Sequence, residues 1–356
     1  MKSGARRSED IWRVGFKESE GEPMTRADRK GETIKGHKIF ITGGAGFIGT
    51  RLCEVLVADN QIVVYDNGHR NALKDTSFAN HPNLRFVPGD VLEAESVKKA
   101  IKGCDLVIHM AAIAGIDSVV KEPLITMKVN LMGTENVLQA SLDKGIGRFL
   151  YFSTSEVYGP LVYKASEEEE TTQGPVGEMR WTYAVSKIAA EHLANCYQKK
   201  YQLPVVIIRP FNVYGPRQVG EGAMHKFIAS AIQNQEIEIY GDGTQIRSWC
   251  FVDDFVEGVL ACLRGPSAVG EVFNLGDPKQ TITLLALADK VIHLAGSRSE
   301  IRFKKRTMPD VHVRVPSIEK ARKFLGYSPK VTLEQGIMKT IAWYQASLEK
   351  SACASS

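Results

Sequence analysis

Tyr183 and Lys187 are the residues of this sequence best suited to acid–base chemistry, and they stand in the segment Tyr183-Ala-Val-Ser-Lys187. Side chains at this spacing lie on one face of a helix, one turn apart. A phenol is a poor base at its ordinary pKa of about 10, but a neighbouring ammonium stabilises the phenolate and brings it into the range of general-base catalysis. The same pattern also occurs by chance as a surface tyrosine beside a solvated lysine, so the pair needs support from the rest of the chain.

A glycine-rich turn supplies that support. It is the segment Thr42-Gly-Gly-Ala-Gly-Phe-Ile-Gly-Thr50, which follows an apolar run and precedes a helical pattern. Glycines in this setting permit a tight turn, let the backbone approach a pyrophosphate, and let the next helix direct its N-terminal N–H groups at the phosphate charge. Glycine-rich turns are common, but a strand before and a helix after indicate a dinucleotide site. The residues of this turn expected at the cofactor are Gly43, Gly46, Phe47, Ile48 and Gly49.

Asp66 ends the second expected strand, roughly twenty residues beyond the glycine turn. A carboxylate at this position accepts hydrogen bonds from the adenosine ribose and repels a 2′-phosphate, so the expected cofactor is NAD rather than NADP. The positive charge of Arg70, close by in the sequence, would attract a 2′-phosphate and so works against the preference for NAD. Asp90 and Val91 follow the third expected strand and are interpreted as adenine contacts, with a turn aspartate that caps the next helix as the alternative.

The elements that must position these residues form a repeating pattern. From His37 to Pro210, short apolar runs alternate with amphipathic stretches, which is typical of βαβ units around a buried parallel sheet. The predicted fold is α/β, a Rossmann-type doubly wound parallel sheet with a smaller mixed α/β C-terminal substrate-binding region. Strands are expected at 38–42, 62–65, 84–87, 106–109, 149–152, 205–208, 236–240, 247–252 and 271–275, and later helices at 253–263, 284–295 and 333–345.

Composition excludes several classes of function. The 356 residues are 44% hydrophobic and 24% charged, with a formal net charge of +4 and no long basic run, so nucleic-acid binding gains no support. The six cysteines stand singly, without the spacing of a zinc site, and no metal is expected. No apolar run reaches the ~18 residues of a membrane span, and the N-terminus lacks an apolar signal core. We expect a cytoplasmic protein with no membrane partner.

Together these segments resemble the extended short-chain dehydrogenase/reductase family, specifically its nucleotide-sugar epimerases, dehydratases and decarboxylases. The resemblance runs from about residue 37 to about residue 346 and is carried by several motifs besides the two above. They are His109-Met-Ala-Ala112, Asn130, Ser153-Thr-Ser-Glu-Val-Tyr-Gly159, Arg209-Pro-Phe-Asn-Val-Tyr-Gly-Pro-Arg217 and Gly241-Asp-Gly-Thr-Gln-Ile-Arg247.

The resemblance implies roles for individual residues. Thr154 is expected to hydrogen-bond the sugar O4, Tyr183 to take the O4 proton, and Lys187 to bind the nicotinamide ribose. Ala111, Ala112 and Asn130 are expected at the cofactor. The nucleotide diphosphate, most simply that of a UDP-sugar, is assigned to Asn212, Arg247 and Arg314, with Arg217 as a weaker candidate, because arginine offers phosphate a planar fork of donors. A homodimer is also implied.

The expected organisation follows from these assignments. Residues 1–36 are charged and poor in aliphatic side chains, and are interpreted as a mobile extension, of which residues 1–23 are expected to be dispensable. Residues 37–210 are the expected NAD-binding domain, residues 211–346 mainly a nucleotide-sugar-binding region, and residues 347–356 a C-terminal tail. Oxidation at C4 gives a 4-keto sugar and NADH, and the ketone then permits epimerisation, decarboxylation or dehydration.

Ser155 and Glu156 bear most directly on the reaction that follows oxidation. UDP-glucuronate decarboxylases and some GDP-sugar 4,6-dehydratases resemble the chain in having Ser-Glu after the threonine, whereas dTDP-glucose dehydratases have Asp-Glu and simple 4-epimerases need no acid or base here. Glu156 is therefore interpreted as an acid–base group near C5 and C6. The alternative is that Glu156 caps a turn or pairs with an arginine. A UDP-sugar or UDP-uronate 4-epimerase and a non-enzymatic NAD-binding regulator remain the other hypotheses.

Overall fold

A seven-stranded parallel sheet forms the centre of the molecule, in a computed structural model that describes residues 34–306 and 308–355. The strand order is β12-β7-β5-β4-β1-β2-β3. Every pairing along it is parallel, as a doubly wound fold requires. The predicted fold class is confirmed. The strands are β1 (Lys38–Thr42), β2 (Gln61–Asp66), β3 (Leu84–Pro88), β4 (Leu106–His109), β5 (Arg148–Phe152), β7 (Val205–Pro210) and β12 (Val272–Leu275).

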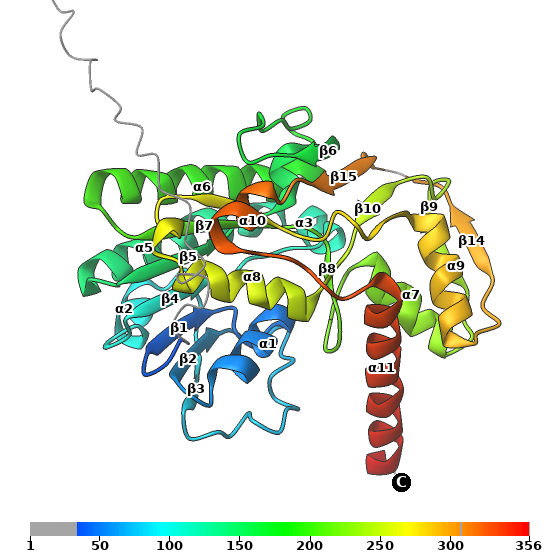
Figure 1. The fold of residues 1–356 in the computed structure, drawn as a ribbon, viewed down its shortest axis with the longest axis horizontal. Coiled ribbons are helices and arrows are strands. Elements are labelled where there is room, and N and C mark those ends of the chain that lie inside the picture. The colour runs from blue at the N-terminus through cyan, green and yellow to red at the C-terminus, as the bar shows by residue number, and fades with distance from the viewer. Residues whose placement is uncertain (1–33, 307, 356) are drawn as a thin grey trace, which may run out of the picture.

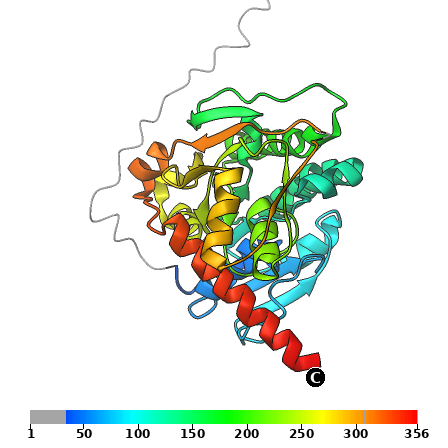
Figure 2. The same cartoon turned by 90° about the vertical axis from the view of Figure 1, so that its right-hand side faces the viewer.

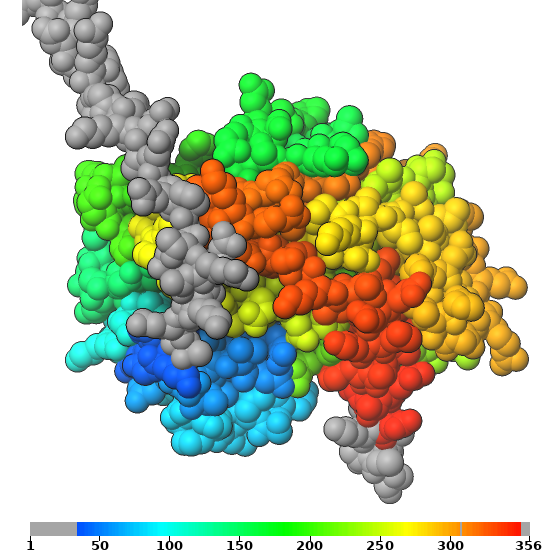
Figure 3. Space-filling view, in the orientation of Figure 1, coloured from blue at the N-terminus to red at the C-terminus, as the bar shows by residue number. Residues whose placement is uncertain are grey.

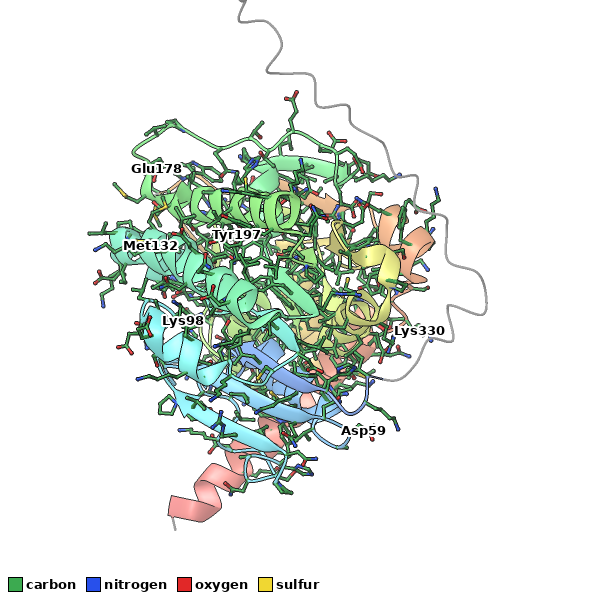
Figure 4. All side chains as sticks on the ribbon, turned by 90° about the vertical axis from the view of Figure 1, so that its left-hand side faces the viewer. Asp59, Lys98, Met132, Glu178, Tyr197 and Lys330 are labelled. Carbon is green, nitrogen blue, oxygen red and sulfur yellow. The ribbon has the colours of Figure 1, made fainter. Side chains whose placement is uncertain are left out.

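Successive side chains of these strands enter two separate cores, one on each face of the sheet. In β1, Ile39 and Ile41 point into one core and Phe40 into the other, because a strand alternates its side chains between faces. The first core is covered by α1 (Phe47–Leu56) and α8 (Val252–Arg264), and the second by α2 (Ala94–Ala100), α5 (Gly133–Lys144) and α6 (Thr182–Tyr201). Figure 4 looks onto the second group, with Tyr197 marking α6.

Three short elements connect β4 to α5 and lie beside α6. They are α3 (Ile116–Lys121), α4 (Pro123–Met127) and the π-helical turn η2 (Lys128–Met132). Two 3-10 turns carry site residues: η3 (Ser155–Tyr158) follows β5, and η4 (Met179–Trp181) leads directly into α6.

The C-terminal region forms a second layer around a four-stranded sheet. Its strand order is β13-β10-β15-β6, with β13 (Thr281–Thr283), β10 (Ile246–Ser248), β15 (Val313–Pro316) and β6 (Leu161–Ala165). Figure 2 shows β6 and β15 side by side above the helices of this region. The remaining elements are the paired strands β8 (Val213–Tyr214) with β11 (Cys250–Phe251) and β9 (Ile237–Tyr240) with β14 (Ile301–Lys304), and the helices α7 (Ala223–Ile232), α9 (Leu284–Ala295), α10 (Glu319–Leu325), α11 (Leu333–Ser355) and η5 (Pro266–Ala268).

The expected boundary at residue 210 is crossed in both directions. After the C-terminal region has begun, α8 and β12 return to the central sheet, where β12 pairs with β7 and the side chains of Phe273 and Leu275 are fully buried. In the opposite direction, β6 leaves the first half of the chain and becomes an edge strand of the C-terminal sheet. Figure 3 shows the segments from β15 to α11 lying across this face of the molecule.

Some expected elements differ in extent. The expected strand 247–252 is divided at Trp249, whose N–H bonds to the Gln280 carbonyl, so β10 and β11 enter different sheets. α11 continues to Ser355 instead of ending at residue 345, so most of the expected tail is helical. β3 is an edge strand with exposed residues rather than a buried one. Most of the expected N-terminal extension, residues 1–33, lies outside the described residues. Within the described part of the chain, no helix has the length and apolar character needed to cross a membrane.

Candidate active site

The glycine turn lies between β1 and α1, and its glycines serve different purposes. A Cβ on Gly43 would approach the Ala111 nitrogen to 2.7 Å, and one on Gly49 would approach the Gly44 Cα to 2.6 Å, so packing of the turn requires both glycines. A Cβ on Gly46 would meet only the Gly43 carbonyl oxygen, at 3.3 Å. Gly46 is the N-cap of α1 and has an ordinary φ of −69°. The contact with the Gly43 carbonyl oxygen is tight but less severe than those at Gly43 and Gly49, so packing constrains Gly46 less, and a glycine at a helix N-terminus leaves the backbone N–H groups open to an anion such as a pyrophosphate.

Asp66, at the end of β2, lies against the glycine turn. Its Oδ2 accepts a hydrogen bond from the Ala45 N–H (3.1 Å) and its Oδ1 accepts one from the Gly68 N–H (2.8 Å), while burial raises its pKa. Arg70 turns its guanidinium toward Glu221 (3.3 Å) and the Ala114 carbonyl (3.3 Å). Because Arg70 is paired with Glu221, its charge is not free to offset the preference for NAD that is expected from Asp66.

The other residues expected at the cofactor mainly contact other parts of the protein. The Asp90 Oδ1 accepts a hydrogen bond from the Leu92 N–H (2.9 Å), which makes Asp90 a turn residue, but the N-cap of α2 is Glu93, so Asp90 does not cap that helix as the alternative interpretation expected. Val91 is buried against α5. Asn130, fully buried in η2, holds the Ile113 N–H (2.9 Å) and the Ser186 hydroxyl (3.0 Å). Asn130 therefore ties the loop after β4 to α6, and that loop contains Ala111 and Ala112. Phe47 and Ile48 begin α1 and pack against its core.

The catalytic residues expected from sequence come together at the carboxyl end of β5. Thr154 follows β5, and its hydroxyl accepts from the Glu156 N–H (3.2 Å) and lies near enough to the Tyr183 phenol to lower the pKa of that phenol. Burial raises the pKa of Tyr183 to about 12, an effect that the Thr154 hydroxyl opposes. Lys187 is buried, with its Nζ 4.6 Å from the centre of the Tyr151 ring. Desolvation lowers the pKa of Lys187 to about 7, while the nearby Glu191 raises it.

Glu156 is held between two arginines. Arg180 donates to both carboxylate oxygens, from Nη1 to Oε2 at 2.9 Å and from Nη2 to Oε1 at 3.3 Å, and Arg314 donates from Nη1 to Oε1 at 2.6 Å. Both arginine side chains are buried. Although burial alone would raise the pKa of Glu156, the two guanidinium groups lower it to about 2. The pairing with arginine foreseen as the alternative is what the structure contains, and Glu156 is an ionised carboxylate at neutral pH.

The residues assigned to the diphosphate do not all gather at one place. Arg247 on β10 stands opposite Arg314 on β15 in the register of their strands. The Arg247 Nη2 donates to the Val311 carbonyl (2.6 Å), and burial lowers its pKa to about 10. Asn212 donates to the Ser248 carbonyl (3.0 Å) on β10. Arg217 lies apart, paired with Glu54 of α1 (2.8 Å). Ser155, the first residue of η3, is buried beside Thr154.

Sequence reasoning missed Arg180 and a second buried ion pair. Arg180 precedes Tyr183 by three residues, and that spacing was a signal that both lie on one helical face. Glu191 follows Lys187 by one turn, and its carboxylate accepts from the Ser153 hydroxyl (2.6 Å) and from Arg209 (2.5 Å). This pair links α6 to the ends of β5 and β7. Among the described residues, no group of three or more His, Cys, Asp or Glu side chains is placed to hold a metal ion.

Comparison with known proteins places this geometry in a wider group. The model of the NAD dependent epimerase/dehydratase family matches residues 39–276. The chain is 33% identical to the UDP-N-acetyl-alpha-D-glucosaminuronate decarboxylase of Bacillus cytotoxicus, over 86% of this chain and 98% of that protein. It is 35% identical to UDP-glucuronic acid decarboxylase 1 of Xenopus tropicalis, over 92% of this chain and 75% of that protein. Its fold is similar to that of the UDP-glucuronic acid 4-epimerase from Bacillus cereus, solved in complex with UDP-glucuronic acid and NAD. The TM-score is 0.80 and the identity is 30%, over 87% of this chain and 99% of that one.

Proposed function

The chain belongs to the NAD dependent epimerase/dehydratase family and is an NAD-dependent enzyme that modifies nucleotide-linked sugars, and from that premise we propose that it decarboxylates a UDP-linked uronic acid. The observation that carries this proposal is the cluster of Arg180, Glu156 and Arg314 beside Thr154 and Tyr183. Buried charges are normally paired, yet here two buried cations share one carboxylate. A carboxylate at C6 of the sugar supplies the missing negative charge.

The charge state of Glu156 speaks against dehydration. Elimination across C5 and C6 needs a proton for the leaving C6 hydroxyl. A carboxyl group with a pKa of about 2 has no proton to give at neutral pH. Loss of carbon dioxide needs no such donor, so the ionised Glu156 is compatible with decarboxylation.

The residues of the site divide the proposed reaction between them. Bound NAD supplies the acceptor for the C4 hydride and later returns it. Tyr183 removes the O4 proton, and Thr154 and Tyr183 hydrogen-bond the resulting C4 carbonyl oxygen. The C5–C6 bond then breaks, carbon dioxide leaves, and the electron pair forms an enolate with its charge on O4. C5 takes a proton, for which Ser155 is a candidate donor, and reduction at C4 leaves a UDP-pentose.

Glu156 has an electrostatic role in this scheme. During decarboxylation, negative charge moves from the C6 carboxylate to O4, toward Tyr183 and Lys187. A fixed negative charge beside C6 favours that movement, whereas arginines alone would stabilise the starting carboxylate. Arg247 and Asn212 remain assigned to the diphosphate. Arg314 stands opposite Arg247 in the strand register and also contacts Glu156, so it lies between the residues assigned to the diphosphate and those assigned to the carboxylate.

A uronate 4-epimerase is the second candidate. Such an enzyme performs the same oxidation and binds the same carboxylate, but keeps it. The similarity to the Bacillus cereus epimerase structure supports this candidate. The two candidates differ in their product, which has five sugar carbons after decarboxylation and six after epimerisation.

We also propose that the enzyme is a homodimer. Exposed apolar side chains gather on α3, α4, η2, η4 and α6, elements that contact one another. Figure 4 shows Met132 and Glu178 on this side of the molecule. An apolar surface of this kind is typical of an interface. Its members are Ile116, Leu124, Met132, Met179 and Val185.

Substitution of Glu156 by glutamine tests the proposed function. With UDP-glucuronate, Glu156→Gln should still reduce the bound cofactor, because oxidation relies on Thr154, Tyr183 and Lys187. The next step should be slow, because the arginines then hold the substrate carboxylate without opposition, so absorbance of the reduced nicotinamide should persist. UDP-glucose, which lacks the carboxylate, should yield no pentose with either protein. Full activity of Glu156→Gln would rule out this role.

A further inference from the structure

Arg180 is fixed in place more firmly than its link to Glu156 alone requires. It lies in η4, where its side chain is buried and its guanidinium carbon is 5.1 Å from the centre of the Trp181 ring. Its backbone N–H donates to the Glu178 carboxylate (3.2 Å). Because η4 continues into α6, Arg180 shares a rigid segment with Tyr183.

The two arginines grip Glu156 differently. Arg180 uses two nitrogens for the two carboxylate oxygens, a bidentate geometry that fixes the orientation of the carboxylate. Arg314 gives Glu156 one hydrogen bond, and its other terminal nitrogen lies 3.3 Å from the Gly159 carbonyl oxygen. In the described part of the chain, the Nε of Arg314 and the Nε of Arg180 are both buried without a hydrogen-bond partner. The difference between the two arginines therefore lies in their grip on Glu156, which Arg314 holds through one oxygen and Arg180 through both.

From this difference we infer that Arg180 is a positioning residue, which anchors the Glu156 carboxylate to the helix carrying Tyr183 and so leaves Arg314 able to bind the substrate carboxylate. The inference rests on the proposed function for the identity of that substrate. The placement of Glu156 by Arg180, however, is a property of the protein alone. If Arg314 turns to the substrate, Arg180 still holds Glu156 through both oxygens.

The charged groups around Glu156 determine how far its pKa should change when Arg180 is removed. The groups that face it are Arg180 from η4, Arg314 from β15, Arg247 from β10 and Tyr183 from α6. Removal of Arg180 leaves Arg314 as the remaining direct partner, so the pKa of Glu156 should rise from about 2 toward its ordinary value. Glu156 would then become protonated at a higher pH than in the native protein.

Arg180→Lys and Arg314→Lys should have different kinetic effects with UDP-glucuronate. Because Arg180 acts through Glu156, Arg180→Lys should lower kcat by roughly 10- to 100-fold, the range for a misplaced group, and leave KM nearly unchanged. Because Arg314 contacts the substrate, Arg314→Lys should raise KM by roughly 10-fold. A rise in KM with unchanged kcat for Arg180→Lys would overturn the inference.

A second measurement does not depend on activity. The carboxyl carbon of Glu156 can be followed by ¹³C NMR in glutamate-labelled protein, with its resonance assigned by its loss in Glu156→Gln. Arg180→Gln should raise the titration midpoint of this resonance. The control is Arg148→Gln, since Arg148 is a partly buried arginine bonded to the Cys262 and Gly265 carbonyls (both 2.9 Å) away from the site. An unchanged midpoint in Arg180→Gln, or an equal rise in the control, would refute the positioning role. If the midpoint rises but no pentose forms from UDP-glucuronate, only the proposed function fails.

Discussion

Burial determines the protonation of the catalytic residues in this protein. It raises the pKa of Tyr183 to about 12 and lowers that of Lys187 to about 7, so at neutral pH the phenol is neutral and the amine is only partly protonated. A low-dielectric site penalises charge until a partner arrives. Glu156 shows the opposite outcome, since two arginines overcome the cost of its burial. We expect the charge that remains on Lys187 and the positive charge of the bound cofactor together to supply the basicity of Tyr183.

Replacement of Tyr183 by phenylalanine tests the assignment of the base. Tyr183→Phe should fold and bind NAD normally, because only one hydroxyl is lost, but turnover should fall by at least roughly 10²-fold, the usual effect of removing a general base. Steady-state kinetics and calorimetry with NAD measure the two quantities. Tyr163→Phe is the matched control, since Tyr163 is exposed on β6. Near-normal turnover in Tyr183→Phe would exclude its catalytic role.

The helical spacing of Tyr183 and Lys187 was sufficient to predict that these two side chains share a face, and the resemblance to known enzymes added Thr154 at the end of a strand. The sequence was not sufficient to predict the partners of Glu156. Arg180 and Arg314 reach it from different parts of the chain, and only tertiary packing brings them together. The pairing of Arg217 with Glu54 depends on such long-range packing as well.

At the scale of elements, the site depends on α6 and on the register of two strands. α6 and the turn before it present Arg180, Tyr183, Lys187 and Glu191 at intervals of about one turn. The parallel pairing of β10 with β15 sets Arg247 beside Arg314. The central strands were predictable because their apolar runs are continuous. β6, β13, β14 and β15 were not predicted, since they are short and partly exposed and their pairing is decided by contacts distant in sequence.

Two glycines of the turn before α1 provide a prediction at this scale. Gly49→Ala should destabilise the fold by about 1–3 kcal/mol, because its methyl group would press on the backbone of Gly44. Gly46→Ala should lower the thermal midpoint without NAD by less than Gly49→Ala, because its methyl group would meet only the Gly43 carbonyl oxygen at 3.3 Å, and it should reduce the rise in that midpoint when NAD is added. Melting curves with and without NAD measure both effects. Equal stabilisation of Gly46→Ala and the native protein by NAD would place the pyrophosphate elsewhere.

At the scale of the molecule, the apolar surface on α3, α4 and α6 gives a test of the homodimer. Leu124→Glu should shift the protein from dimer to monomer in light scattering, because a charge in an apolar interface is costly. Leu161→Glu is the control, since Leu124 and Leu161 are both 69% exposed and Leu161 lies on β6. A native monomer, or the same mass for both variants and the native protein, would contradict the proposal.

The division of the chain into domains was the least predictable feature of the fold. A boundary at residue 210 follows from the change in hydrophobic pattern, but β12 returns to the first sheet and β6 departs for the second. These exchanges place residues from both halves around one site. Glu156 and Arg180 come from the first half and Arg314 from the second, so the substrate carboxylate is expected where the two parts meet.

Release of carbon dioxide from UDP-glucuronate labelled with ¹³C at C6 is the most direct test of the central claim. The reaction should be run with the full-length protein in deuterated water and followed by NMR. Decarboxylation predicts one labelled carbon dioxide for each UDP-pentose formed, with deuterium at the carbon that was C5. A six-carbon product that retains the label and differs only in configuration at C4 would contradict the claim and identify a uronate 4-epimerase.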